Sequence, residues 1–202
     1  MPETLYHVFG AVCGQNPGHT WSPGGSLLPF CQRCTGLYLG ACVAAILHLW
    51  LRPKLSRWFL AIHLGFLLLM APFGFHWIEH GPAVRTLTGV LFGFGVVTLL
   101  RVPLAEAAMG RQAASNRNLG HEPARAGKAP ARLWLYFGSL ITTLLLTPLA
   151  AVAGGNLSAG VLSVLAVGGL LALAALMAAN CCLAAVGTWR AFRGGVRLRP
   201  QP

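Results

Sequence analysis

Residues 31–40 read Cys31-Gln32-Arg33-Cys34-Thr35-Gly36-Leu37-Tyr38-Leu39-Gly40. This pair of cysteines runs directly into an apolar segment that extends to Leu51, just long enough to cross the apolar core of a bilayer as a helix. Glycines four residues apart are typical of transmembrane helices that pack closely against a neighbour. The stretch therefore predicts that polar chemistry and a membrane-spanning helix meet at one point.

The composition of the whole chain indicates a membrane protein. Of its 202 residues, 55% are hydrophobic and only 9% are charged, whereas about 25% of the residues of soluble domains are charged. A net charge of +11 would suggest a nucleic-acid partner for a soluble protein, but here the basic residues lie mostly between and after the apolar runs. We therefore expect them to set topology and contact membrane lipids, with no nucleic acid as partner.

Five apolar runs predict an all-α, polytopic membrane protein with about five transmembrane helices. We expect spans at 35–51, 58–75, 84–100, 133–153 and 157–187. The fifth run is longer than a straight span needs, so we expect it to tilt or to extend beyond one membrane surface. The chain start has no basic region followed by an apolar one, so we expect no cleavable signal peptide.

The segments around these runs complete the predicted organisation. Residues 1–34 are rich in turn-forming Gly and Pro, which predicts a Cys/His segment without long regular elements. Residues 35–100 are expected to form a three-helix core that carries the motifs, and 133–189 the two C-terminal helices. The basic stretch 101–132 is predicted to be a flexible loop, because its composition cannot bury enough apolar surface to fold alone, and 190–202 a basic tail.

The distribution of Lys and Arg predicts the orientation in the membrane. The connections on one side, with the C-terminal tail, hold 13 of the 15 basic residues, and the other side holds only Arg33 and Arg85. By the positive-inside rule, the N-terminus lies outside and the C-terminus inside. The Cys/His segment and the basic 101–132 loop would then be extracytoplasmic and cytoplasmic, respectively.

Three thiols and one imidazole lie in the predicted outer segment, at Cys13, His19, Cys31 and Cys34. Such a set can close a tetrahedral zinc site, and the closely spaced Cys31 and Cys34 are typical of a metal knuckle. A structural disulfide is one alternative, because an outside location favours oxidation. A redox-active pair is another, because Arg33 and the helix N-terminus favour a thiolate. All three interpretations stay open.

A threonine–glycine motif occurs twice, each time just after an arginine. Both helices would run from outside to inside, so their small residues would lie at similar depth and pack as parallel helices. Two guanidinium groups would then meet at the outer surface, which predicts a pocket for a phosphate or carboxylate, such as a lipid headgroup. The alternative is that each arginine reaches lipid phosphates separately. The two copies are Arg33, Thr35, Gly36 and Gly40, and Arg85, Thr88, Gly89 and Gly93.

Histidines elsewhere add candidate groups. The link before the third span carries His76, Glu79 and His80, which are candidate catalytic groups for proton transfer if the protein is an enzyme; solvated interfacial side chains are the alternative. His48 and His63 lie near the inner ends of adjoining antiparallel helices. There we expect hydrogen bonding between helices rather than haem ligation.

Residues 31–40 resemble the hallmark of a family of small prokaryotic integral membrane proteins, domain of unknown function 2085. The family reads C-x-R-C-T-G-x-Y-x-G, which includes Tyr38, and a later R-x-x-T-G-x-x-x-G helix is similar to the run that begins at Arg85. The resemblance covers about residues 10–100, although Gly14 stands where the family often has histidine and no aspartate precedes Arg85. It implies a multi-pass protein of the cytoplasmic (inner) membrane of a prokaryote, and it supplies no reaction.

Together these observations predict an integral membrane protein with a Cys/His site, with zinc as its expected metal, beside an arginine-lined anion pocket. A membrane enzyme acting on a lipid or isoprenoid phosphate and a thiol–disulfide redox protein are the alternative functions. The fourth and fifth spans carry little polar chemistry. They are expected to serve as scaffold or as contacts between copies in a homo-oligomer.

Overall fold

Five long α-helices make up most of the structure, a computed structural model that describes residues 9–10, 12–75, 77–119 and 129–194. All five are long and apolar enough to cross a membrane, and the described residues form no named β-strand. This confirms the predicted all-α, polytopic membrane fold. The helices are α2 (Gln32–Trp50), α3 (Arg57–Gly74), α4 (Pro82–Leu119), α5 (Ala129–Ala153) and α6 (Asn156–Gly194).

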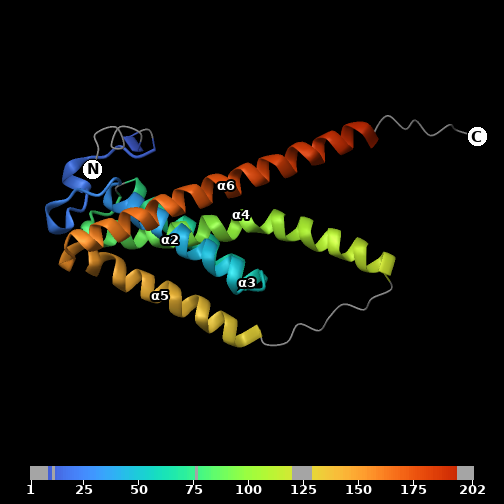
Figure 1. Cartoon of the computed structure of the whole chain (residues 1–202), viewed down its shortest axis with the longest axis horizontal. Helices are drawn as coiled ribbons and strands as arrows, with labels where there is room; N and C mark the ends of the chain where they lie inside the picture. The colour runs from blue at the N-terminus through green and yellow to red at the C-terminus, as the bar shows by residue number, and fades with distance from the viewer. Residues whose placement is uncertain (1–8, 11, 76, 120–128, 195–202) are drawn as a thin grey trace, which may run out of the picture.

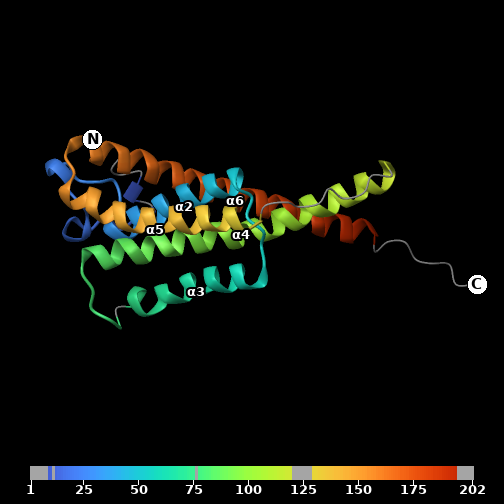
Figure 2. The same ribbon diagram turned by 90° about the horizontal axis from the view of Figure 1, so that it is seen from below.

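Helix α2 lies in the middle of the bundle, in contact with α4, α5 and α6. Helix α3 packs mainly on α4, at the outer side of the bundle (Figure 2). Only 11% of the apolar window of α3 is buried within the protein, so most of this helix is available to lipid. Pro72 lies inside α3 near its end, as the sequence predicts.

Helices α2 and α4 approach closely because glycines line both contact faces. The facing pairs advance in the same direction along both helices, so the parallel packing predicted from the repeated motif is confirmed. Small residues at such interfaces let two transmembrane backbones touch. The contact gains dispersion energy, which drives association because lipid is as apolar as the side chains and supplies no hydrophobic effect. A Cβ atom would overlap the facing main chain at Gly36 against Thr86, Gly40 against Val90, Gly89 against Arg33 and Gly93 against Leu37.

The prediction of a flexible loop over 101–132 is wrong for its first part, because α4 continues past Leu100 to Leu119. Residues 120–128 lie outside the described part of the chain, and α5 begins at Ala129. The stretch after Pro103 is rich in alanine, which has the highest intrinsic helix propensity and needs no burial to stay helical. Likewise α6 continues to Gly194, so the predicted tail is helical at its start. Figure 1 shows both helices extending beyond the rest of the bundle.

Residues 12–31, the described part of the chain directly before α2, fold over the end of the bundle with only short regular elements. They contain two short 3-10 turns, η1 (Pro17–His19) and η2 (Pro23–Gly25), and Thr20 pairs with Cys31 in an isolated antiparallel bridge. The indole Nε1 of Trp21 donates to the hydroxyl of Thr86 at 2.9 Å. This bond ties the segment to α4 and places its cysteines beside the start of α2.

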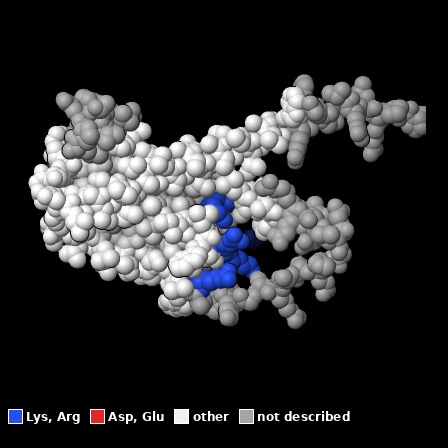
Figure 3. All heavy atoms as spheres, in the orientation of Figure 1, with Lys and Arg blue, Asp and Glu red and all other residues white. Residues whose placement is uncertain are grey.

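The charges of the bundle are unequally shared between its two ends. Arg33 and Arg85 lie near the N-terminal ends of α2 and α4, under the N-terminal segment. The other described Lys and Arg side chains gather at the opposite end (Figure 3). The helical packing thus keeps apart the two sets of cations that the sequence assigns to opposite membrane surfaces.

Candidate functional site

Three of the four predicted metal ligands converge at the start of α2. The Sγ atoms of Cys13, Cys31 and Cys34 all lie within 4.8 Å of one another. Cys31 is the N-cap of α2 and Cys34 lies one turn later, so helix geometry alone brings this pair together. Cys13 comes from a separate segment, and its sulfur accepts a hydrogen bond from the main-chain N–H of Cys31 at 3.3 Å. All three are free thiols.

The surroundings of Cys13 favour its thiolate form. Hydrogen bonds from the thiols of Cys31 and Cys34 lower the pKa of Cys13 below its usual value, against the opposing effect of burial. The thiolate is the form of cysteine that binds metals and attacks disulfides. The cluster is therefore chemically suited to hold a soft cation or to exchange disulfides.

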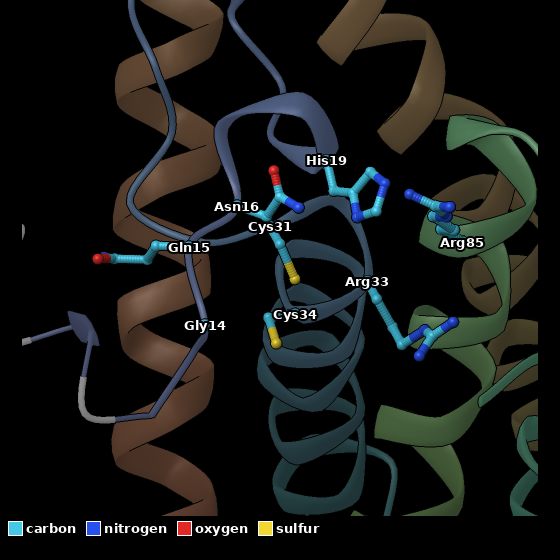
Figure 4. Close-up of a pocket in the computed structure, with 8 residues that line it drawn as sticks. All are labelled: Gly14, Gln15, Asn16, His19, Cys31, Arg33, Cys34 and Arg85. Carbon is cyan, nitrogen blue, oxygen red and sulfur yellow. The ribbon is translucent and has the colours of Figure 1, made fainter. Parts of the chain in front are cut away.

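A cavity of about 270 Å³ adjoins the cysteine cluster. Figure 4 shows the sulfur atoms of Cys31 and Cys34 on one side of the first turn of α2, with the cationic side chains on the other. The cavity thus has a side lined by sulfur atoms and a side lined by cations. No carboxylate is among the lining residues to neutralise these cations. The lining residues are Gly14, Gln15, Asn16, His19, Cys31, Arg33, Cys34 and Arg85.

Arg33 of α2 and Arg85 of α4 line this one cavity, as the repeated motif predicts. Each guanidinium has a buried Nε without a hydrogen-bond partner. Across the described part of the chain, neither arginine forms an ion pair with an Asp or Glu. Two guanidinium groups with free donors can bind a phosphate or carboxylate in a bidentate manner.

The ring of His80 contacts the guanidinium of Arg33. The Nη2 of Arg33 donates to the carbonyl of Phe73 at 2.9 Å and lies 3.2 Å from the Nε2 of His80. The Nδ1 of His80 lies 2.6 Å from the carbonyl of Ile78. With its proton on Nδ1 donated to that carbonyl, the ring accepts from Arg33 through Nε2. His80 is not among the residues that line the cavity, so it contacts Arg33 from outside the cavity.

The other candidates that the structure describes are not part of the sulfur cluster. His19 lines the cavity but is not within the group of three sulfur atoms, and its ring lies toward Arg85 (Figure 4). Glu79 is exposed and does not line the cavity. His76 lies outside the described residues. Of the two described candidate acid–base groups of the link, neither Glu79 nor His80 lines the cavity.

Two lining residues, Gln15 and Asn16, were not predicted as site residues. The amide of Gln15 donates to the carbonyl of Pro29 at 2.9 Å, and Gln15 has a φ of 40°, which is uncommon for a residue other than glycine. Asn16 caps η1 by accepting from the main-chain N–H of Gly18 at 3.0 Å. An Asn-Pro-Gly turn is a recognisable sequence signal for this geometry, so Asn16 could have been found.

A second polar cluster is buried deeper in the bundle and joins four helices. His48 Nε2 lies 3.0 Å from Thr98 Oγ1, Thr98 Oγ1 lies 3.2 Å from the Tyr136 hydroxyl, and that hydroxyl lies 2.9 Å from His63 Nε2. All four side chains are at most 2% exposed. The expectation that His48 and His63 hydrogen-bond helices together is confirmed. The threonine and the tyrosine that connect them were not anticipated.

Comparison with known proteins matches the part of the chain that carries the cavity. A family described as a predicted membrane protein, domain of unknown function 2085, matches residues 13–99. An uncharacterized protein of Methanothermobacter thermautotrophicus is 35% identical over 101 aligned residues, which cover 46% of this chain and 88% of that relative. No solved structure matches the chain. The family match includes the cysteine cluster and both arginines but neither α5 nor α6. This chain therefore belongs to the domain of unknown function 2085 family of predicted membrane proteins.

Proposed function

We propose that this membrane protein binds a metal ion, with zinc as the expected species, through the thiolates of Cys13, Cys31 and Cys34. The observation that carries the proposal is the convergence of three sulfur atoms to within 4.8 Å from two separate segments. In a tetrahedral site, zinc–sulfur bonds of about 2.3 Å require sulfur atoms about 3.8 Å apart. Only a small contraction of the cluster is needed to reach that spacing.

Three thiolates leave one tetrahedral position for a further ligand. His19 lines the adjoining cavity, so a shift of η1 would let its imidazole close the site with four protein ligands, as in structural zinc sites. An anion or water from the cavity would instead leave the site open, as in catalytic zinc sites. Metal binding by a His19→Ala variant separates the two, because only the closed site loses a protein ligand.

The test is metal content and thiol reactivity measured on the same detergent-purified sample. Cys181 and Cys182 are exposed, so both are first changed to serine to remove their background labelling. About one zinc per chain, with the three cluster thiols protected until a chelator is added, is the expected result. Absence of metal, with thiols that label only after reduction, would contradict the proposal and favour the disulfide or redox alternative.

The cationic side of the cavity supports a second candidate function, a membrane enzyme acting on a lipid or isoprenoid phosphate. Arg33 and Arg85 would hold the phosphate, with their buried and unpartnered Nε atoms as the supporting observation. His19 is the histidine among the lining residues. Its imidazole could transfer a proton to or from the bound substrate. The test is release of phosphate from phosphatidic acid and from an isoprenyl diphosphate by the full chain. No turnover of either by the zinc-loaded protein would favour a binding role.

A further inference from the structure

The end of the bundle opposite the cysteine cluster carries a second set of cations on several elements. Figure 3 shows the described Lys and Arg side chains there gathered on one face, on which no acidic side chain is visible. Glu106, an exposed residue of α4, is a described carboxylate near this end, five residues after Arg101. We call this set of cations the inner basic patch. It consists of Arg52 and Lys54 in the connection between α2 and α3, Arg57 at the start of α3, Arg101 in α4 and Arg132 near the start of α5.

Packing within the protein brings these cations together. The Nη1 of Arg132 donates to the carbonyl of Leu51 at 3.4 Å, which places a guanidinium of α5 over the C-terminal end of α2. Arg101 is half-buried, and its Nε is buried without a hydrogen-bond partner. An unmet N–H donor on a charged group is costly unless something binds it. The patch therefore has both the charge and an unmet donor for an anion.

Tryptophans place the inner basic patch at the level of lipid headgroups. Trp50, Trp58 and Trp134 are 83%, 82% and 80% exposed, and each lies within two residues of a cation of the patch. Exposed tryptophans are enriched where a membrane protein crosses from hydrocarbon to headgroups. A soluble protein has no reason to expose three indole rings beside one charge cluster. The anion that reaches these cations is therefore expected to be part of a lipid.

We infer that the inner basic patch binds the phosphate of an anionic phospholipid, with Arg101 and Arg132 as its main donors. Guanidinium groups match phosphate oxygens in a bidentate manner, and basic pockets between transmembrane helices are suited to anionic headgroups. Positively charged connections favour the cytoplasmic leaflet, where anionic lipids attract them. The inference is independent of the cysteine cluster, which lies at the other end of the bundle.

The experiment measures lipid binding by the full chain in detergent. Phosphatidylglycerol and phosphatidylcholine with the same acyl chains are titrated while bound lipid is counted by native mass spectrometry and the unfolding midpoint is followed. The test variant is Arg101→Gln with Arg132→Gln. The matched control is Arg111→Gln with Arg117→Gln, which removes the same charge from residues of α4 that follow the apolar span ending at Met109.

We expect phosphatidylglycerol to bind and raise the midpoint more than phosphatidylcholine does. The test variant should bind phosphatidylglycerol about 25-fold more weakly, since each of its two basic residues near an anionic surface contributes about a fivefold factor, and the control should bind it normally. If the double variant does not purify, Arg57→Gln, whose side chain is exposed, should show about a fivefold loss. Equal binding of both lipids, equal losses in test and control variants, or the same midpoint shift with inorganic phosphate alone would each overturn the inference.

Discussion

Gly89 of α4 packs directly on the carbonyl oxygen of Arg33 in α2, with no space for a Cβ atom between them. Arg85 lies one turn before Gly89 on the same helix, so this contact also sets how closely the two arginines approach. The glycine packing of α2 on α4 therefore also brings together the two arginines that line the cavity. The repeated motif combines an arginine with a glycine because the two must lie on the same face of each helix.

We predict that Gly89→Ala lowers the unfolding midpoint in detergent, because the added methyl group forces the two backbones apart at a cost of about 1–3 kcal/mol. The control is Gly65→Ala in α3, where a Cβ atom would meet nothing within 4 Å and the higher helix propensity of alanine is the main effect. Equal midpoints for the two variants would show that the contact between α2 and α4 is not tight in the protein.

Cys34→Ser is predicted to remove most of the bound zinc, because a serine hydroxyl cannot replace a thiolate ligand. Cys34 is held at the start of α2 within the sulfur cluster, whereas Cys182 is exposed on α6, so Cys182→Ser is the matched control and should retain the metal. The measurement is elemental analysis of both purified variants. Retention of zinc by Cys34→Ser would exclude the three-thiolate site.

Arg85→Lys is predicted to weaken the binding of inorganic phosphate to the cavity by about tenfold, because lysine keeps the charge but lacks the planar fork. The affinity is measured by calorimetry on the purified protein. Arg111→Lys changes an arginine of α4 beyond the apolar span that ends at Met109, outside both the cavity and the inner basic patch, and should leave this affinity unchanged. An equal affinity for the two variants would mean that the cavity does not recognise phosphate through Arg85.

His80→Phe is predicted to weaken the binding of inorganic phosphate to the cavity by about three- to tenfold. The reason is that it removes the ring nitrogen that accepts a hydrogen bond from Arg33. The bound zinc should be unaffected, since His80 is not part of the sulfur cluster. His80→Gln keeps an acceptor and should recover part of the affinity. A loss of zinc in His80→Phe, or no recovery in His80→Gln, would indicate a general structural role instead of positioning.

Much of this architecture could be predicted because a bilayer constrains a sequence strongly. Each span must be apolar over its length, so five helices are visible in the hydropathy alone. The approach of α2 and α4 could be predicted because close packing in lipid requires small residues, and Gly36 and Gly89 occupy equivalent places in two copies of one motif. Cys31 and Cys34 could be paired because one helical turn separates them.

The features that could not be predicted depend on contacts between distant residues or on the competition between two weak effects. Thr98 and Tyr136 look like ordinary residues of an apolar span, and only the folded bundle places them between His48 and His63. The residue at which α4 ends could not be predicted. After Leu100 the high helix propensity of the sequence favours a helix, whereas the lack of apolar burial disfavours one. His19 is close enough in sequence to join the cysteines, but η1 holds it on the other side of the cavity.

Tyr136 joins α5 to the part of the chain that the family shares, because its hydroxyl contacts His63 of α3 and Thr98 of α4. Tyr136→Phe keeps the ring contacts but leaves both buried partners without this bond. Hydrogen bonds between transmembrane helices contribute about 0.6 kcal/mol on average, and an unmet buried group costs about 1–3 kcal/mol. We therefore expect a loss of about 1–2 kcal/mol in unfolding free energy, measured by denaturant titration in mixed micelles.

The control for that loss is Ser139→Ala on the same helix, whose hydroxyl donates only to the carbonyl of Leu135 one turn earlier, at 2.8 Å. This bond joins no second helix, so its removal should change the unfolding free energy by less than about 0.5 kcal/mol. If Tyr136→Phe were no more destabilising than Ser139→Ala, the polar network would not hold α5 against the bundle. Apolar and small-residue contacts such as those of Gly169 with Tyr38 would then carry the attachment of the C-terminal helices.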